Sequence, residues 1–367
     1  MIKYSIMKKI VSILVLAFTF ILACVSCQTN TVKIGVIVPE STGLGISMKA
    51  GMKLAEAELN KDSDVKYKVI VEDAATENDV SKAYDRLRSV KNVRIFVTAG
   101  TQYSLKLKSN TVGNGDLLLC VASDPAITAE GFWGVYKVGN SSVDESDYII
   151  EHLKENAPGE KVAVFYPNTT YGLPFKETLC SQLEDSVPVV YEEGAFQQYD
   201  GMISKVLAEN PGRIVAIGFS PSLGILVKKL RAAGFEGEIL SNTGFADSDV
   251  MAAAGDAVKD VLYIDYDFEA SRATEERNEF TQKKYKIDFT SICFLAHAIP
   301  YLLDAGLKND LSAVSDGNVD GQLDEALLHK ASDRLRSLKT LKIADEYPYI
   351  ILENGDVKPS LVLKKHE

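Results

Sequence analysis

The stretch from Val32 to Asn60, VKIGVIVPESTGLGISMKAGMKLAEAELN, combines a strand, a turn and a helix in one run. Its apolar residues at 32, 34, 36 and 38 alternate as a strand requires, and Ile37 makes the second face apolar as well. A strand that is apolar on both faces is typical of a parallel sheet covered by helices on both sides. This stretch therefore favours an α/β fold.

The turn that follows cannot continue the strand, because residues 39–43 include a proline, a glycine and two hydroxyl residues. Met48, Met52, Ala55 and Leu59 then recur at spacings of 4, 3 and 4, which predicts one buried helix face. Ligands of open α/β sheets bind at the carboxyl ends of strands, against helix amino termini. The turn is therefore a candidate ligand loop.

Segments with strand and helix periodicity keep alternating after this unit, in two sets of similar size that end near residues 139 and 267. This pattern predicts two doubly wound lobes with parallel sheets. If three chain segments cross between the lobes, they form a hinged cleft, which is a common place for a ligand.

The last part of the chain is less regular. Residues 308–346 are polar and predict a surface insertion with one helix at 323–338. Beyond it we expect a hairpin that pairs 347–352 with 361–363, because Asn354-Gly355 is a favoured hairpin turn.

The amino terminus has the features of a targeting segment. Three Lys at positions 3, 8 and 9 precede an uncharged apolar run from Ile10 to Ala23, which is too short for a usual transmembrane helix. A small residue before a cysteine at the end of such a run resembles a lipoprotein cleavage site. Residues 1–23 are interpreted as a lipoprotein signal peptide, with Cys24 or alternatively Cys27 as the lipid attachment site. An ordinary cleaved signal peptide without lipid is the other alternative.

Length, charge and cysteine content limit the class of protein. The chain after residue 23 has about 340 residues, which is typical of two domains. Residues 1–23 contain three Lys and no acid, so without them the formal net charge moves from −11 to −14, which argues against nucleic acid as a partner. Cys120, Cys180 and Cys293 stand in apolar contexts that indicate buried small hydrophobes, with a disulfide between two of them as the alternative.

Enzyme signatures are mostly absent. Gly43-Leu44-Gly45 follows a strand as a dinucleotide fingerprint would, but Met48 occupies the third glycine position. The sequence has no phosphate-binding loop, no Gly-x-Ser-x-Gly elbow and no metal-like spacing of its four His. His297 lies on an apolar helix face, which favours a core or inter-helix role. We therefore expect no catalytic residue, metal or cofactor.

Three polar loops, Gly100–Ser104, Ala122–Asp124 and Thr170–Gly172, each end a strand and begin a helix or turn. Backbone N–H groups in such loops can bind a carboxylate, and hydroxyl groups add further donors. The same residue types also serve as ordinary helix caps. Spacing alone does not separate these two interpretations.

Five local patterns resemble the type I periplasmic solute-binding proteins, the branched-chain amino-acid-binding (leucine/isoleucine/valine-binding) family of ABC transporters, and the resemblance covers about residues 32 to 364. AGTQYS takes the place of the family's Ser-rich ligand loop, VASDPAIT resembles its Ser-Ala-Thr-x-Pro-x-Leu-Thr segment, and YPNTTYG resembles its Asn-x-x-Tyr-Gly strand end. GFSPSLGILVKKLRAAGF and SNTGFADSDVMAAAGDAVKDVLY resemble later family segments in the same order. The resemblance implies a periplasmic-binding-protein-like type I fold, with two doubly wound parallel-sheet lobes joined by a three-segment hinge.

The same resemblance implies how the chain is divided. The first lobe is expected to contain residues 31–139 and 268–345, and the second lobe residues 140–267 and 346–367.

The resemblance also implies the ligand contacts. In the first lobe they fall on Thr101, Gln102 and Ser104, and then on the backbone of Ala122 and the side chain of Ser123. These groups would hold the carboxylate and amino groups of a ligand.

In the second lobe, Tyr171 would close over the ligand, and Ser220 or its neighbour Phe219 stands where the family often has a Tyr. Thr243 stands where amino-acid binders carry an acid that pairs with the ligand's ammonium group. Without that acid a buried ammonium lacks its counter-charge, so Asp124 or Asp247 is the expected substitute.

Together these features imply a lipid-anchored extracytoplasmic solute-binding protein of an ABC importer, located in the periplasm or on the outer cell surface. It would capture a small polar solute, an amino acid or a related carboxylate or amide, by hinge closure, and deliver it to a permease and ATPase complex. The alternative is a sensing module that presents bound solute to a membrane signalling receptor.

Overall fold

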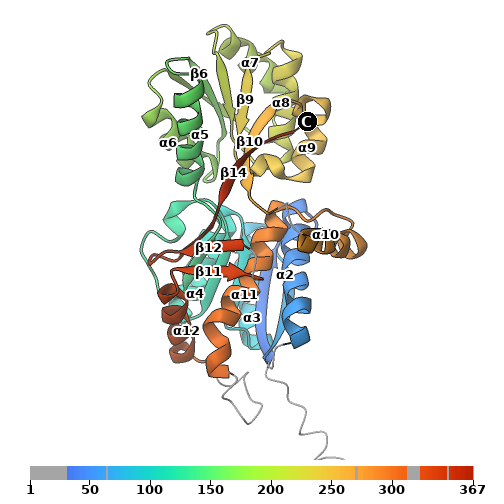
Figure 1. The fold of residues 1–367 in the computed structure, drawn as a ribbon, viewed down its shortest axis with the longest axis vertical. Helices are drawn as coiled ribbons and strands as arrows, with labels where there is room; N and C mark the ends of the chain where they lie inside the picture. The colour runs from blue at the N-terminus through green and yellow to red at the C-terminus, as the bar shows by residue number, and fades with distance from the viewer. Residues whose placement is uncertain (1–30, 63–64, 269–271, 312–322, 345–346, 367) are drawn as a thin grey trace, which may run out of the picture.

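The computed structural model describes residues 31–62, 65–268, 272–311, 323–344 and 347–366, which form two α/β lobes stacked along the long axis of the molecule (Figure 1). The expected signal peptide and both candidate lipidation sites, Cys24 and Cys27, lie outside these residues. In the part of the chain that the structure describes, no helix is long and apolar enough to cross a membrane.

Strands and helices alternate in both lobes, as the periodicity predicts. The first lobe contains β1 (Thr31–Val38), α2 (Gly43–Asp62), β2 (Lys66–Asp73), α3 (Glu77–Lys91), β3 (Ile95–Ala99), α4 (Thr101–Asn114), β4 (Leu117–Val121) and β5 (Val135–Val138), and later α10 (Arg272–Tyr285), α11 (Ser291–Leu311), α12 (Glu325–Ser337), β11 (Thr340–Ile343), β12 (Tyr347–Ile351) and β13 (Asp356–Pro359). The second lobe contains α5 (Ser142–Asn156), β6 (Val162–Pro167), α6 (Gly172–Gln182), β7 (Ser186–Tyr191), α7 (Tyr199–Leu207), β8 (Arg213–Ala216), α8 (Pro221–Ala232), β9 (Glu238–Ser241), α9 (Ser248–Ala254), β10 (Val261–Tyr266) and β14 (Leu361–Lys365).

Each lobe is built on one sheet. The strand order is β11-β12-β13-β5-β4-β3-β1-β2 in the first lobe and β14-β10-β9-β8-β6-β7 in the second. Neighbouring strands run parallel, except for the pairs β11–β12, β12–β13 and β10–β14 at one edge of each sheet. The chain passes between the sheets three times, after β5, after β10 and after β13. This is the two-lobed α/β fold with a three-segment hinge that the sequence predicts.

The carboxyl end of the chain departs from the expected division. β12 and β13 pair with each other, and β13 also pairs with β5 of the first sheet through Asp356 and Val357. The assignment of residues 347–359 to the second lobe is therefore wrong, and of the segments after residue 346 only β14 joins the second sheet. The expected hairpin is also corrected, because the partner of β12 across the Asn354-Gly355 turn is β13 and not 361–363.

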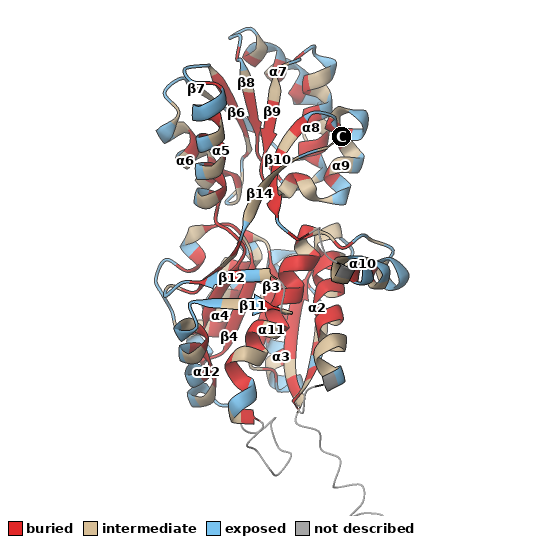
Figure 2. Ribbon diagram, in the orientation of Figure 1, coloured by how far each residue is buried: buried red, intermediate tan, exposed pale blue. Residues whose placement is uncertain are grey.

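Both faces of each sheet are covered by helices (Figure 2). Val32, Ile34 and Val36 point to the core under α2 and α11, whereas Ile37 belongs to the core under α3 and α4. The predicted helix face of α2 is buried at Met48, Met52 and Ala55 and half-buried at Leu59, as expected. In the second lobe α7, α8 and α9 cover one face and α5 and α6 the other.

The expected surface insertion is more integrated than its polar composition suggests. Leu328, Ala331 and Leu335 of α12 are buried in the first-lobe core, and β11 extends the first sheet. His297 on α11 is 2% exposed, and its Nε2 lies 2.6 Å from a Glu58 carboxylate oxygen, so the inter-helix role predicted for it is confirmed. Cys120, Cys180 and Cys293 are free thiols.

Candidate ligand-binding site

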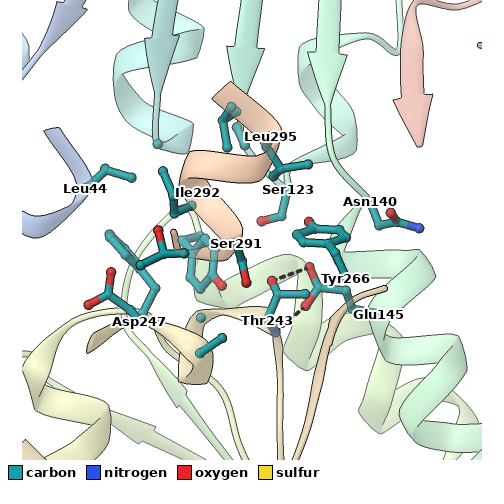
Figure 3. Close-up of a pocket in the computed structure, with 18 of the residues that line it drawn as sticks. Leu44, Ser123, Asn140, Glu145, Thr243, Asp247, Tyr266, Ser291, Ile292 and Leu295 are labelled. Carbon is teal, nitrogen blue, oxygen red and sulfur yellow. Dashed lines mark hydrogen bonds between the residues drawn. The ribbon is translucent and has the colours of Figure 1, made fainter. Parts of the chain in front are cut away.

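The carboxyl ends of strands from both sheets face the gap between the lobes, and a pocket lies there. The inner chamber encloses about 750 Å³ of empty space, its open mouth included, and is mostly apolar (Figure 3). Its lining residues come from both lobes: Leu44, Gly100, Thr101, Val121, Ala122, Ser123, Val138, Asn140, Glu145, Tyr171, Phe219, Thr243, Gly244, Ala246, Asp247, Tyr266, Thr290, Ser291, Ile292 and Leu295. A mostly apolar lining with a few polar groups is typical of a small-molecule site.

A second space, the outer chamber, continues from the inner one toward solvent and encloses about 1000 Å³ by the same measure. The turn at 39–45 contributes to it, as the sequence predicts for a ligand loop. Its lining residues are Pro39, Thr42, Gly43, Leu44, Ala99, Gly100, Thr101, Gln102, Tyr103, Thr169, Thr170, Tyr171, Glu193, Phe219, Ser220, Pro221, Asp247 and Asp249.

The amino terminus of α4 supplies hydrogen-bond donors from the first lobe. β3 ends at Ala99, and Gly100 turns the chain with φ +85°, a conformation that favours glycine. The first intrahelical bond runs from the Ser104 N–H to the Gly100 carbonyl, so the N–H groups of residues 101–103 have no acceptor within the helix. Thr101 is 4% exposed, and its Oγ1 has no hydrogen-bond partner among the described residues. This end of the helix is suited to an anionic group.

Two further polar atoms line the inner chamber without a partner. Ser123 follows β4, is buried, and has an unpaired Oγ although its carbonyl accepts the Ser142 N–H at 2.8 Å. Asn140 lies in the first hinge crossing, and its Oδ1 is also unpaired within the described part of the protein. Buried polar atoms of this kind usually have a partner, so a bound polar solute is the expected one.

Glu145 is the buried acid of the inner chamber, which the half-buried Asp247 also lines. It lies in the first turn of α5, is 1% exposed, and accepts hydrogen bonds from the Thr243 N–H at 2.9 Å and the Thr243 hydroxyl at 3.1 Å (Figure 3). Burial raises the pKa of Glu145 to about 7, although the two Thr243 bonds act in the opposite direction. No Lys or Arg forms an ion pair with it among the described residues. A cationic group in the chamber would provide the missing counter-charge.

The structure brings most of the predicted contacts together. Thr101, Ala122, Ser123, Tyr171 and Thr243 all line the inner chamber. The ring of Tyr171 lies 5.1 Å from that of Phe219, so these two side chains form an aromatic wall shared by both chambers. The Tyr171 hydroxyl accepts a hydrogen bond from the Asn242 side chain.

Three predicted contacts lie elsewhere. Ser104 lines neither chamber, because it sits on the buried side of α4 and its hydroxyl donates to the Gly100 carbonyl at 2.7 Å. Gln102 and Ser220 line only the outer chamber. Ser220 caps α8 and donates to Glu193 Oε1 at 2.5 Å.

Of the two expected substitute acids, Asp124 is corrected and Asp247 stays a candidate. Asp124 caps the short 3₁₀ turn Pro125–Ile127 and lines neither chamber. Asp247 lines both chambers. The acid that is hydrogen-bonded to Thr243, however, is Glu145. Sequence reasoning missed Glu145 because an acid in the first turn of a helix is common for helix-dipole reasons alone. It also missed Ser291, Ile292 and Leu295, which α11 directs into the chamber from the first lobe (Figure 3).

In the described ranges, no group of three or more His, Cys, Asp or Glu side chains is arranged to hold a metal ion. The polar groups of the inner chamber are hydroxyls, amide groups and two carboxylates, those of Glu145 and Asp247. This arrangement is suited to binding a small polar molecule.

A family model described as periplasmic binding protein matches residues 31–288, which is more than half of the chain. The chain belongs to the periplasmic binding protein family. Among curated relatives, the Leu/Ile/Val-binding protein homolog 3 of Brucella melitensis is 20% identical over 326 residues, covering 83% of this chain and 88% of the relative. The leucine-, isoleucine-, valine-, threonine- and alanine-binding protein of Pseudomonas aeruginosa is 23% identical, covering 65% of this chain and 68% of the relative.

Solved structures with the same fold include the leucine-binding protein LivK of Thermotoga maritima, with a TM-score of 0.78, 18% identity, and coverage of 92% of this chain and 95% of that one. LivJ of Streptococcus pneumoniae in complex with isoleucine has a TM-score of 0.78 at 15% identity, with 92% and 96% covered. A solute-binding protein of R. palustris in complex with benzoate has a TM-score of 0.76 at 15% identity, with 92% and 93% covered. These likenesses show the type I fold.

Membership in this family identifies a solute-binding protein and not an enzyme. The periplasmic character of the family also supports an extracytoplasmic location for this chain.

Proposed function

We propose that this protein captures a small amino acid, or a related carboxylate or amide, between its two lobes and delivers it to an ABC importer. The observation that carries the proposal is that one chamber contains both hydrogen-bond donors for an anionic group and an acid for a cationic group. The α4 amino terminus with Thr101 and Ser123 offers donors to a carboxylate, while Glu145 offers an acceptor to an ammonium group.

The two halves of this arrangement come from different lobes. Thr101 and Ser123 belong to the first lobe, whereas Glu145 and Thr243 belong to the second. A zwitterionic solute would therefore hold the lobes together by bonding to both. Closure of a hinged cleft around the solute follows from this geometry.

The remaining walls favour a solute with an apolar part. Leu44, Val121, Ile292 and Leu295 surround the polar groups. The relatives named for branched-chain amino acids and the neighbour solved with isoleucine agree with such a solute, and the neighbour solved with benzoate extends the range to a simple carboxylate. We favour a solute with an amino group because of Glu145.

We further propose that a lipid on Cys24 or Cys27 anchors the protein to the membrane, and that a permease and ATPase complex is its partner. The basic and apolar segment before these cysteines supports the anchor. Replacing both cysteines by Ser should release the protein from membranes in cells, and a double variant that stays membrane-bound after washing without detergent would contradict the lipid.

The function is tested by mass spectrometry of small molecules released from the purified protein, followed by calorimetry with L-leucine and benzoate. An amino acid or related carboxylate in the released fraction, with saturable binding, is the expected result. A released solute of another class, such as a sugar or nucleoside, would contradict the proposal. A neighbouring gene for a histidine kinase in place of a permease would favour the sensing alternative.

A further inference from the structure

We infer that the outer chamber is a second subsite, which holds an ammonium or guanidinium group at the far end of an elongated solute whose amino-acid head occupies the inner chamber. This inference rests on the proposed function, because it assigns the class of solute that the same cleft takes.

The charged residues that line the outer chamber are all acidic. Glu193, Asp247 and Asp249 line it, and none of the described residues lining either chamber is Lys, Arg or His. None of the three carboxylates forms an ion pair with another described residue. Adding Glu145, the continuous cleft presents four acids.

The carboxylates are oriented by neutral donors. Asp247 Oδ1 accepts the Asp249 N–H at 2.8 Å, and Glu193 Oε1 accepts the Ser220 hydroxyl at 2.5 Å. Asp249 reaches across from the second lobe to the start of α2, where a Cβ added at Gly43 would lie only 2.6 Å from its Oδ2. These bonds fix positions but supply no positive charge.

Helix dipoles offset part of this charge. The amino termini of five helices, α2, α4, α6, α8 and α9, border the outer chamber, and each is equivalent to about half a positive charge. Their sum of about two and a half charges is still smaller than that of the three carboxylates. Burial also raises the pKa of Asp247, which agrees with a carboxylate that lacks a cationic neighbour.

Thr101 lies where the two chambers meet, so a solute that binds its hydroxyl can reach both. Its side chain lines both of them, is 4% exposed, and has an Oγ1 without a partner within the described residues. The chambers also share Tyr171, Phe219 and Asp247, so they are parts of one cleft. Glu145 and Asp247 lie on opposite sides of the inner chamber (Figure 3), so the acids mark the two ends of an elongated molecule.

The test compares L-arginine with L-citrulline by calorimetry on the dialysed protein. The two probes share the amino-acid head and differ in the charge of the end group. We expect arginine to bind about tenfold more tightly at low salt, with an advantage that shrinks as NaCl is added. The double variant Asp247→Asn with Asp249→Asn should lose most of this advantage, and Asn retains the capping of α9.

Asp185→Asn is the matched control, because Asp185 is an exposed carboxylate before β7 that lines neither chamber. It should keep the full preference for arginine. Citrulline or L-leucine binding as tightly as arginine to the unaltered protein would overturn this inference alone. If arginine, citrulline and leucine all fail to bind, the result contradicts both the proposed amino-acid function and this inference. The salt dependence of the unaltered protein keeps the test decisive if the double variant does not fold.

Discussion

At the scale of single residues, Glu145 is the buried acid of the inner chamber. It is packed against Thr243, and the pKa of Glu145 is also influenced by Asp144 beside it on α5 and by Lys137 on β5. Tyr171 and Tyr266 are neutral neighbours whose own pKa values burial raises well above the usual range. The pKa of Glu145, about 7, therefore lies within the physiological pH range.

This predicts that the affinity for the solute depends on pH. Whether the affinity rises or falls with pH distinguishes the two classes of solute. An ammonium-bearing solute binds the ionised carboxylate, so affinity should rise between about pH 6 and pH 8 as the proton is lost. A carboxylate without an amino group should show the opposite trend, because ionised Glu145 repels it. Calorimetry at three pH values measures the trend, and Glu145→Gln should abolish it. A slope that persists in the Gln variant would assign the dependence to another group.

Ser123 and Ser104 form a matched pair for testing the location of the site. Both are buried serines near the same sheet edge, but only Ser123 lines the inner chamber with an unpaired hydroxyl. Ser123→Ala should weaken solute binding by about 1–3 kcal/mol, whereas Ser104→Ala should leave the affinity unchanged. Titration calorimetry with the recovered solute decides between them. The reverse result would restore the contact that the sequence predicts for Ser104.

Sequence reasoning identified the loops of this site better than its chemistry. Thr101, Ser123 and Thr243 could be predicted because each stands in a short motif that resembles a segment of the family. Glu145 could not, since it meets Thr243 only when two segments 98 positions apart are brought together by folding. Thr101 and Ser104 lie three residues apart at the start of α4, but only the Thr101 side chain lines the chambers. The sequence does not show which way each of these side chains points.

At the scale of elements, long periodic segments were predictable and short strands were not. β1 and α2 carry strong apolar periodicity, whereas β11 and β13 have four residues each, too few to show a period. Their place in the first sheet depends on pairing with β12 and β5.

The contact between α2 and α11 gives an element-scale prediction. A Cβ at Gly51 would lie 2.3 Å from the Cys293 carbonyl oxygen, so the two helices approach closely because this position is glycine. Gly51→Ala should lower the free energy of unfolding by about 1–3 kcal/mol despite the better helix propensity of Ala. Gly113→Ala in α4, where a Cβ meets nothing within 4 Å, should raise it by roughly 0.5 kcal/mol. Urea denaturation measures both, and equal effects would contradict close packing at Gly51.

At the scale of the whole molecule, three crossing segments and an ion pair join lobes that otherwise have separate cores. Lys358 on β13 lies 2.9 Å from Asp144 on α5, which links the first lobe to the second beside the hinge. Asp265 on β10 pairs with Lys364 at 2.7 Å and accepts a hydrogen bond from Ser291, a lining residue of the inner chamber. These contacts connect the hinge to the pocket.

The central claim is that a small solute binds between the lobes and closes the hinge. Small-angle X-ray scattering of the protein with and without the solute recovered from it tests this claim most directly. Because bonds from Thr101 and Ser123 on one lobe and from Glu145 on the other converge on the solute, the radius of gyration should decrease at saturation. An unchanged scattering profile at saturating solute would contradict closure and indicate a rigid two-lobed scaffold.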